Sequence, residues 1–241
     1  DGIVCLPSVR GEPAAHDRLL KLLIAAWETV QPGSWKPAVL DKLLADADTP
    51  PSGFRELHLF PGVEISVQGG VHLLAIFDPS ATSQTISDLL AKVDYSGTRG
   101  DSDGVTREGG AKVVEKTLAE GGIAIPAHVE SAKGLLQLEP GTRKCQLDTT
   151  TVKQILQEPG LLALEWCDQK VQKPMVLDEL KLSFASVVGS DCHSFQGAAV
   201  PGSRYTWIKM AMPSLEGLRL ALLDGQEISV RRSDDGDGFA P

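Results

Sequence analysis

Short apolar runs of strand length alternate with helical patterns from about residue 57 onward. Most of these runs are rich in Val, Ile and Leu, and they cover residues 57–60, 63–67, 71–77, 123–126, 161–164, 184–188 and 205–208. Runs of this kind between helices are typical of parallel strands that are buried on both faces. The alternation therefore predicts an α/β fold built from βαβ units.

The segments between these runs carry the periodicity of amphipathic helices. Apolar residues share one helical face in three sets: Leu20, Leu23, Ile24 and Trp27; Ile86, Leu89, Leu90 and Val93; and Val152, Ile155 and Leu156. We expect a helix over 111–120 to end at Gly121-Gly122, and another to begin at Pro213-Ser214 and end before Gly225. The Gly- and Asp-rich stretch 94–110 is expected to be a loop.

Composition narrows the class of protein. The chain has 241 residues, of which 42% are hydrophobic and 23% charged, which suits one large α/β domain or two small ones. A net charge of −9 argues against sequence-independent binding of nucleic acid, which needs clustered Lys and Arg, although a local basic opening is compatible with it. There is no apolar run long enough to predict a membrane span, and no signal-peptide pattern.

Cysteine spacing points to a reducing compartment. The four cysteines are far apart and form no C-x-x-C pair: Cys5, Cys145, Cys167 and Cys192. Neither a disulfide framework nor a structural zinc knuckle is therefore expected, and the cytoplasm fits best. Both ends have features of a fragment, since the chain opens with Asp1-Gly2-Ile3 and closes with a polar acidic stretch. We expect one domain over 1–232 and a linker or tail over 233–241.

Ionisable side chains lie at or just beyond the ends of the predicted strands, where barrels and open α/β sheets build their active sites. They are Glu64, His72, His128, Asp191 and His193. Imidazole and carboxylate groups together are the ligands of zinc, manganese or iron. This set is sufficient for at least one metal, and two neighbouring metals could clamp a phosphoryl group and activate a water.

Each of these residues also has an ordinary structural explanation. A single His at a strand end is usually a hydrogen-bonded core or rim residue, Glu64 fits a strand edge, and Asp191 fits a turn or a helix N-cap. The joint pattern is less expected by chance than any single member. His16, next to a charged helix, and His58, which lacks a carboxylate partner, are assigned structural roles only.

Other polar residues are weaker candidates. Arg204 could bind substrate phosphate, because a guanidinium group can donate two hydrogen bonds to it, whereas Arg99 in the Gly-rich loop is better explained as a surface residue. That loop lacks the G-K-[ST] end of a P-loop, so no nucleotide site is predicted. Glu165 lies at a predicted strand end and has no role beyond supporting a ligand. Cys192 is expected to be a small buried thiol, with metal binding as the alternative.

In order and approximate spacing, these motifs resemble those of the PHP (polymerase and histidinol phosphatase) superfamily. Its G-x-E, H-x-L, A-H and G-S-D-A-H motifs correspond to Gly62-Val63-Glu64, to His72 onward, to Ala127-His128 and to Gly189-Ser190-Asp191-Cys192-His193. The D-x-H element is the most specific of them. The resemblance implies a distorted (β/α)7 barrel with a trinuclear centre, commonly of zinc, manganese or iron.

The resemblance also implies a role for each ligand. Glu64 would bridge two metals, His72 and His128 would complete the second metal, Asp191 would join the first and His193 the third. The family's H-x-H and T-D-H motifs do not occur in this sequence. Asp1-Gly2-Ile3 resembles the residues that follow T-D-H, so we expect the first strands and first ligands of the barrel to lie in a segment missing from this chain.

Flanking segments narrow the resemblance to the PHP module of TrlF-type ATPases, in which a PHP domain precedes an SMC-like ATPase. The segments are 104–106, 121–131, 204–210 and 213–219. The likeness covers about residues 57–232, while residues 1–56 are expected to be mainly helical and match the family poorly. It implies an SMC-like ATPase domain in the same polypeptide.

Three functional hypotheses follow. The first is a cytoplasmic, metal-dependent phosphoesterase with two or three divalent ions, acting on a phosphate ester, with nucleic acid as one substrate class. The second is a degenerate PHP module without metal that has a structural or regulatory role. The third is a different barrel-type metal hydrolase, such as an amidohydrolase.

Overall fold

The computed structural model describes residues 2–5, 58–98, 104–192, 198–200, 202–225 and 228–235. All the described residues belong to one compact unit. Several sequence-based predictions lie outside the described residues: His16, the helix around 20–27, Arg99 and His193. No helix in the described part of the chain is long and apolar enough to cross a membrane.

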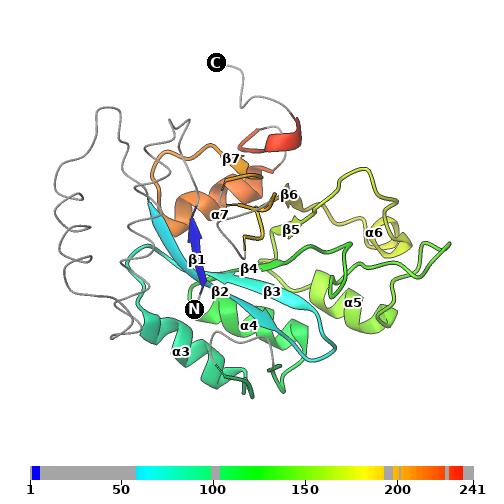
Figure 1. The fold of residues 1–241 in the computed structure, drawn as a ribbon, viewed down its shortest axis with the longest axis horizontal. Coiled ribbons are helices and arrows are strands. Elements are labelled where there is room, and N and C mark those ends of the chain that lie inside the picture. The colour runs from blue at the N-terminus through cyan, green and yellow to red at the C-terminus, as the bar shows by residue number, and fades with distance from the viewer. Residues whose placement is uncertain are drawn as a thin grey trace. The chain divides into compact units, whose positions relative to one another are not determined.

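The largest sheet has four strands in the order β1-β2-β3-β4, and each neighbouring pair is antiparallel (Figure 1). The strands are β1 (Gly2–Cys5), β2 (Leu59–Ser66), β3 (His72–Ile76) and β4 (Ile123–Pro126). Two runs predicted as separate strands form the single strand β2, which continues through Pro61-Gly62. The connection between β2 and β3 turns at Gly69 and Gly70, both at positive φ. It is far shorter than the dozen or so residues that a parallel crossover needs, so these strands are antiparallel and the parallel prediction is wrong here.

Two smaller sheets follow. β5 (Ala163–Glu165) pairs with β6 (Ala185–Val187) in parallel, as predicted, and β7 (Thr206–Ile208) pairs with β8 (Val230–Arg232) antiparallel. The amide of Val129, just past β4, donates to the Glu165 carbonyl at 2.8 Å and so links β4 to β5. In the described part of the chain these strands close no barrel. The described residues therefore show a mixed α/β arrangement, and the expected (β/α)7 barrel stays a prediction.

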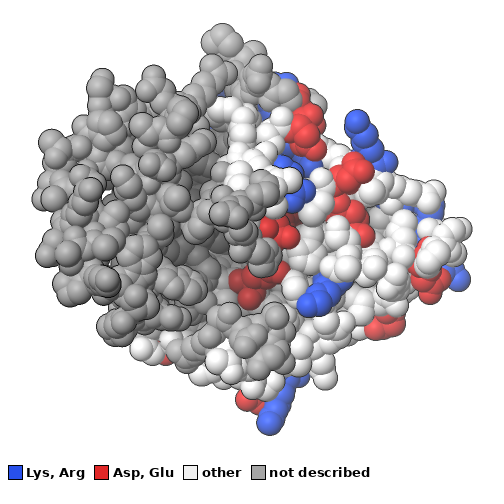
Figure 2. Space-filling view, in the orientation of Figure 1, with Lys and Arg blue, Asp and Glu red and all other residues white. Residues whose placement is uncertain are grey.

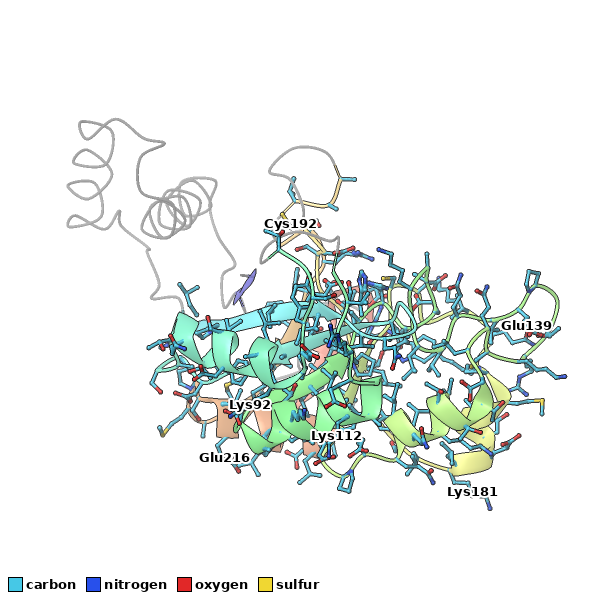
Figure 3. The ribbon with its side chains drawn as sticks, turned by 90° about the horizontal axis from the view of Figure 1, so that it is seen from below. Lys92, Lys112, Glu139, Lys181, Cys192 and Glu216 are labelled. Carbon is cyan, nitrogen blue, oxygen red and sulfur yellow. The ribbon has the colours of Figure 1, made fainter. Side chains whose placement is uncertain are left out.

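Helices cover the strands, and their ends follow local sequence signals. They are α3 (Ser83–Lys92), α4 (Gly110–Ala119), α5 (Thr149–Leu156), α6 (Met175–Leu180) and α7 (Leu215–Asp224). The predicted ends of α4 and α7 are confirmed, since Gly121 and Gly225 both have φ of 78°. The Ser214 side chain caps α7 by accepting from the Gly217 amide at 3.1 Å. Figures 1 and 3 show α3 and α4 along one face of β2 and β3.

Buried side chains form two hydrophobic clusters. One joins β2 and β3 to α3, α4 and α5, and includes Leu73, Leu89, Val113 and Ile155. The other joins the strands to α7, and includes Phe60, Ile123, Ile125, Leu218 and Val230. Each such side chain contributes about 1.5–3 kcal/mol by burial. β4 supplies side chains to both clusters, which explains its uninterrupted apolar sequence.

Arg232 connects β8 to the ends of β5 and β6. Its side chain is fully buried, and its guanidinium group donates to the carbonyls of Trp166 and, at 3.0 Å, Val187. Two further nitrogens donate to the two carboxylate oxygens of Asp234, each at 2.8 Å. Asp234 belongs to the 3-10 turn Ser233–Asp235, within the stretch expected to be a linker. The buried guanidinium group therefore ties the ends of β5 and β6 to β8.

Candidate metal centre

Three side chains from three neighbouring strands, or from just past a strand end, converge on one point. Glu64 Oε1 contacts His72 Nδ1 and lies 3.5 Å from His128 Nε2, and the two imidazole nitrogens are 3.2 Å apart. The three potential ligand atoms lie within 4.8 Å of one another. Within the part of the chain that the structure describes, this is the one group of His, Cys, Asp and Glu side chains with such geometry.

Strand register explains why Glu64 and His72 meet. Glu64 lies opposite Leu74 in the β2–β3 pair, and His72 is two residues before Leu74 on the same strand. Because side chains alternate between the faces of a strand, His72 and Leu74 share the face to which Glu64 points. Diagonal neighbours of this kind are within reach of long side chains. The antiparallel pairing thus brings together two residues that are separated by a tight turn in the sequence.

His128 reaches the same point through a break in its strand. β4 ends at Pro126, and continued alternation would direct the His128 side chain away from the face of Ile125. Instead His128 has a φ of 32°, an uncommon conformation for a residue other than glycine. Its imidazole ring meets that of His72 edge to face, with the ring centroids 5.1 Å apart. The strained backbone at His128 is therefore part of what assembles the triad.

Two of the three separations between ligand atoms of the triad fit a divalent metal. Ligand atoms about 2.0–2.1 Å from a tetrahedral ion are about 3.3 Å from one another, close to the 3.2 Å and 3.5 Å separations found here. The outer ring nitrogens, His72 Nε2 and His128 Nδ1, are buried and have no hydrogen-bond partner among the described residues. Among the described residues, both rings therefore make their polar contacts through the nitrogens that face the triad, His72 Nδ1 and His128 Nε2.

Protonation within the triad follows from its contacts. Burial alone would raise the pKa of Glu64, but hydrogen bonds with His128 and His72 outweigh it and lower that pKa to about 2. The hydrogen bond with Glu64 raises the pKa of His128, against the effect of its partial burial. Glu64 is thus a carboxylate that faces two imidazole rings at neutral pH. This charge pattern favours a cation between the three side chains.

Asp191 lies near the triad without being part of it. It is exposed, has a φ of 48°, and its charge contributes to the raised pKa of His128. Cys192, which follows it, is exposed rather than buried as expected, and it lies beyond the end of β6 at Val187. Figure 3 shows Cys192 on the opposite side of the fold from Lys112 and Glu216. The predicted ligand roles of Asp191 and of His193, which is outside the described residues, stay predictions.

Arg204 contacts a neighbouring strand end. It is half-buried, and its guanidinium group lies near enough to the thiol of Cys167, just past β5, to lower the pKa of that thiol. Burial and the charges of Glu130 and Glu165 raise the pKa of that thiol, and the contact with Arg204 opposes this effect. One oxygen of Glu130, Oε2, is buried without a hydrogen-bond partner among the described residues. Sequence reasoning singled out Arg204 but gave no signal for these neighbours.

Glu165 has contacts that the sequence did not reveal. It is 8% exposed, and its two carboxylate oxygens accept from two backbone amides. Oε2 accepts from the His128 amide at 3.0 Å, and Oε1 accepts from the Gly189 amide at 2.9 Å. The sequence did offer one signal for Glu165, which is a carboxylate between Leu164 and Trp166 at the end of a buried strand.

Comparisons with known proteins give one structural relative to consider. No family model matches the chain, and no curated protein matches it. Among solved structures, the lesion-specific endonuclease PfuEndoQ from Pyrococcus furiosus matches with a TM-score of 0.51 and 16% sequence identity. The match covers 78% of this chain and 45% of the endonuclease, so the chain spans less than half the length of that protein. At this identity the likeness concerns the fold alone. It supports a PHP-like fold and gives no support to the narrower TrlF-type resemblance.

Proposed function

We propose that this chain is part of a metal-dependent hydrolase of phosphate esters, in which Glu64, His72 and His128 hold a divalent ion. The convergence of Glu64 Oε1, His72 Nδ1 and His128 Nε2 carries this proposal. Asp191 and His193 are proposed as further ligands on the sequence resemblance, which implies two or three ions. Zinc, manganese and iron all suit a set of imidazole and carboxylate ligands.

The chain's own residues would divide the work as follows. When bound, the ion supplies Lewis acidity, which polarises a phosphoryl oxygen and makes water a stronger nucleophile near neutral pH. Glu64 supplies the negative charge that balances the ion, and the sheet holds the two imidazole rings in place. Arg204, half-buried at a neighbouring strand end, is proposed to bind and orient a phosphate oxygen. A guanidinium group suits this task because it keeps its charge and donates from a planar edge.

Nucleic acid is the substrate class we propose to test first. The structural relative is described as a lesion-specific endonuclease, and a phosphodiester fits the ligands of the proposed centre. The net charge is −9, and in the described part of the face in Figure 2 basic and acidic side chains are interspersed. We therefore expect binding through local contacts near Arg204 rather than through a broad basic surface. Linkage to an SMC-like ATPase and a cytoplasmic location rest on the sequence alone.

A degenerate module without catalytic metal is the second candidate. The observation that favours it is the absence of H-x-H and T-D-H motifs from these 241 residues. Such a module would keep the PHP-like fold and act as a structural or regulatory partner. It predicts a chain that hydrolyses no phosphate ester, whether or not metal is added.

The two candidates can be separated by hydrolysis of bis-p-nitrophenyl phosphate and of a short DNA duplex, with zinc or manganese added. We expect metal-dependent hydrolysis by the wild type and by His58→Ala, a matched control because His58 is exposed and outside the triad. His72→Ala should reduce the rate by more than about 100-fold, since the ion supplies several kcal/mol of stabilisation. Equal rates in all three proteins would contradict the proposal, and a metal-loaded wild type that hydrolyses neither substrate would favour the degenerate module.

A further inference from the structure

We infer that Glu165 is a positioning residue of the metal centre: its buried carboxylate holds the backbone of His128 and of the segment that leads to Asp191. This inference rests on the proposed metal-binding function and extends it to a residue outside the triad. Glu165 is the last residue of β5, between the strand end that carries His128 and the strand end that precedes Asp191. It touches the backbone that presents these side chains and not the side chains' ligand atoms.

The carboxylate acts as a fork between two strand ends. One oxygen accepts from the His128 amide at 3.0 Å and the other from the Gly189 amide at 2.9 Å. The backbone carbonyl of Glu165 also accepts from the Val129 amide at 2.8 Å. Two successive amides after β4 are therefore held by one residue of β5. A buried carboxylate is costly unless its oxygens accept hydrogen bonds, and here both do.

This fork accounts for the unusual backbone at His128. A φ of 32° is unfavourable for histidine and persists only where the surroundings fix it. Glu165 accepts hydrogen bonds from the amides of His128 and Val129, which lie on either side of the His128 Cα atom. The conformation in turn directs the imidazole ring toward His72. Loss of the fork should therefore loosen a ligand without removing it.

Gly189 shows that the other side of the fork is closely fitted. A Cβ atom at this position would lie 3.1 Å from Glu165 Oε1, closer than nine in ten such contacts. Glycine thus allows the carboxylate to approach the amide that it accepts from. The segment from Gly189 leads directly to Asp191, whose charge acts on His128. Glu165 therefore couples the geometry of two parts of the proposed centre.

The test is the affinity of the chain for zinc, measured by competition with a chromophoric chelator in Glu165→Gln. The amide of glutamine has one oxygen and one NH2 group, so one of the two backbone amides loses its acceptor. Groups that orient metal ligands typically change affinity by about 10–100-fold when altered, and we expect a loss in that range. Amide hydrogen exchange at His128 or Gly189 should also become faster in this variant.

Two control variants separate positioning from general stability. Val152→Ala removes volume from the buried face of α5, a helix that supplies no triad residue, and should lower Tm while leaving zinc affinity at the wild-type value. Glu139→Gln makes the same chemical change on an exposed residue far from Cys192 in Figure 3, and should change neither. If Glu165→Gln does not fold, Gly189→Ala perturbs the fork from its other side and should also weaken zinc binding.

The outcomes are distinct. Weaker zinc binding in Glu165→Gln, with wild-type affinity in Val152→Ala, supports the inference. A wild type that binds zinc, together with a Glu165→Gln variant that binds it as tightly or loses no more than Val152→Ala, overturns the inference and leaves the proposed function intact. A wild type that binds no zinc overturns both.

Discussion

Replacing Arg232 with methionine should destabilise the fold, because Arg232 is a fully buried cation that ties three strand ends together. Methionine keeps much of the apolar stem but leaves the Trp166 carbonyl without this donor, and the Val187 carbonyl keeps only the hydrogen bond from the Trp166 amide at 3.0 Å. Each buried polar group left unsatisfied costs about 1–3 kcal/mol. Release of the desolvated guanidinium group offsets part of this cost. We therefore expect the free energy of unfolding to fall by about 2–4 kcal/mol.

The loss in the free energy of unfolding should depend on whether Asp234 is present. Asp234→Asn leaves a buried charge without its counter-ion, but the carboxylate is itself half-exposed, so we expect a smaller loss of about 1–3 kcal/mol. The double variant should cost no more than Arg232→Met alone, because the carboxylate then has no buried partner to lose. At about 2–4 °C per kcal/mol for a domain of this size, Arg232→Met should lower Tm by about 4–16 °C.

Urea denaturation followed by circular dichroism measures these costs directly. Arg231→Met is the matched control, since Arg231 precedes Arg232 on β8 and donates to the Asp235 carbonyl at the surface. We expect that variant to lose less than about 1 kcal/mol. An Arg232→Met protein within about 0.5 kcal/mol of the wild type, the usual range for surface substitutions, would refute the reasoning. Equal losses in Arg232→Met and Arg231→Met would do the same.

Two further predictions follow from particular contacts. The hydrogen bond from Arg232 lowers the pKa of Asp234 below its ordinary value of 3.8, so this pair stabilises the fold above that pH and the contribution is lost as pH falls through the lower, folded-state pKa. Urea denaturation at pH 6 and pH 3 should show a smaller pH dependence in Asp234→Asn than in the wild type. Gly134→Ala would place a Cβ atom 2.4 Å from the backbone oxygens of His128 and Val129, so its free energy of unfolding should fall by more than about 1 kcal/mol; an unchanged denaturation midpoint would contradict this.

Local signals predicted the helix ends and the positions of most strands. Ser214 and the glycines at 121 and 225 act within one turn of their own helices, so their roles are visible in the sequence. Strand direction was not visible in the sequence, because an apolar run that is buried on both faces has the same composition in parallel and antiparallel sheets. The short turn at Gly69-Gly70 carried the missing information, since no parallel crossover fits there.

The grouping of Glu64, His72 and His128 could be predicted from motif order, but the means of assembly could not. Nothing in the sequence indicates that His128 adopts a positive φ, because that conformation depends on contacts with residues far along the chain. The same applies to Glu165 and Arg232, whose partners are largely backbone groups of other strands. Backbone groups are present at every residue, so the sequence gives no pattern that identifies which of them a buried charge will meet.

The metal content of the purified chain tests the central claim most directly. The protein would be prepared without chelator or a metal-affinity tag and analysed by elemental mass spectrometry, alongside His72→Ala/His128→Ala and the exposed-histidine control His58→Ala. We predict tightly bound transition-metal ions in the wild type and in His58→Ala, and their loss in the double variant. A wild type without metal, even after reconstitution with zinc or manganese, or a double variant that retains the same content, would contradict the account.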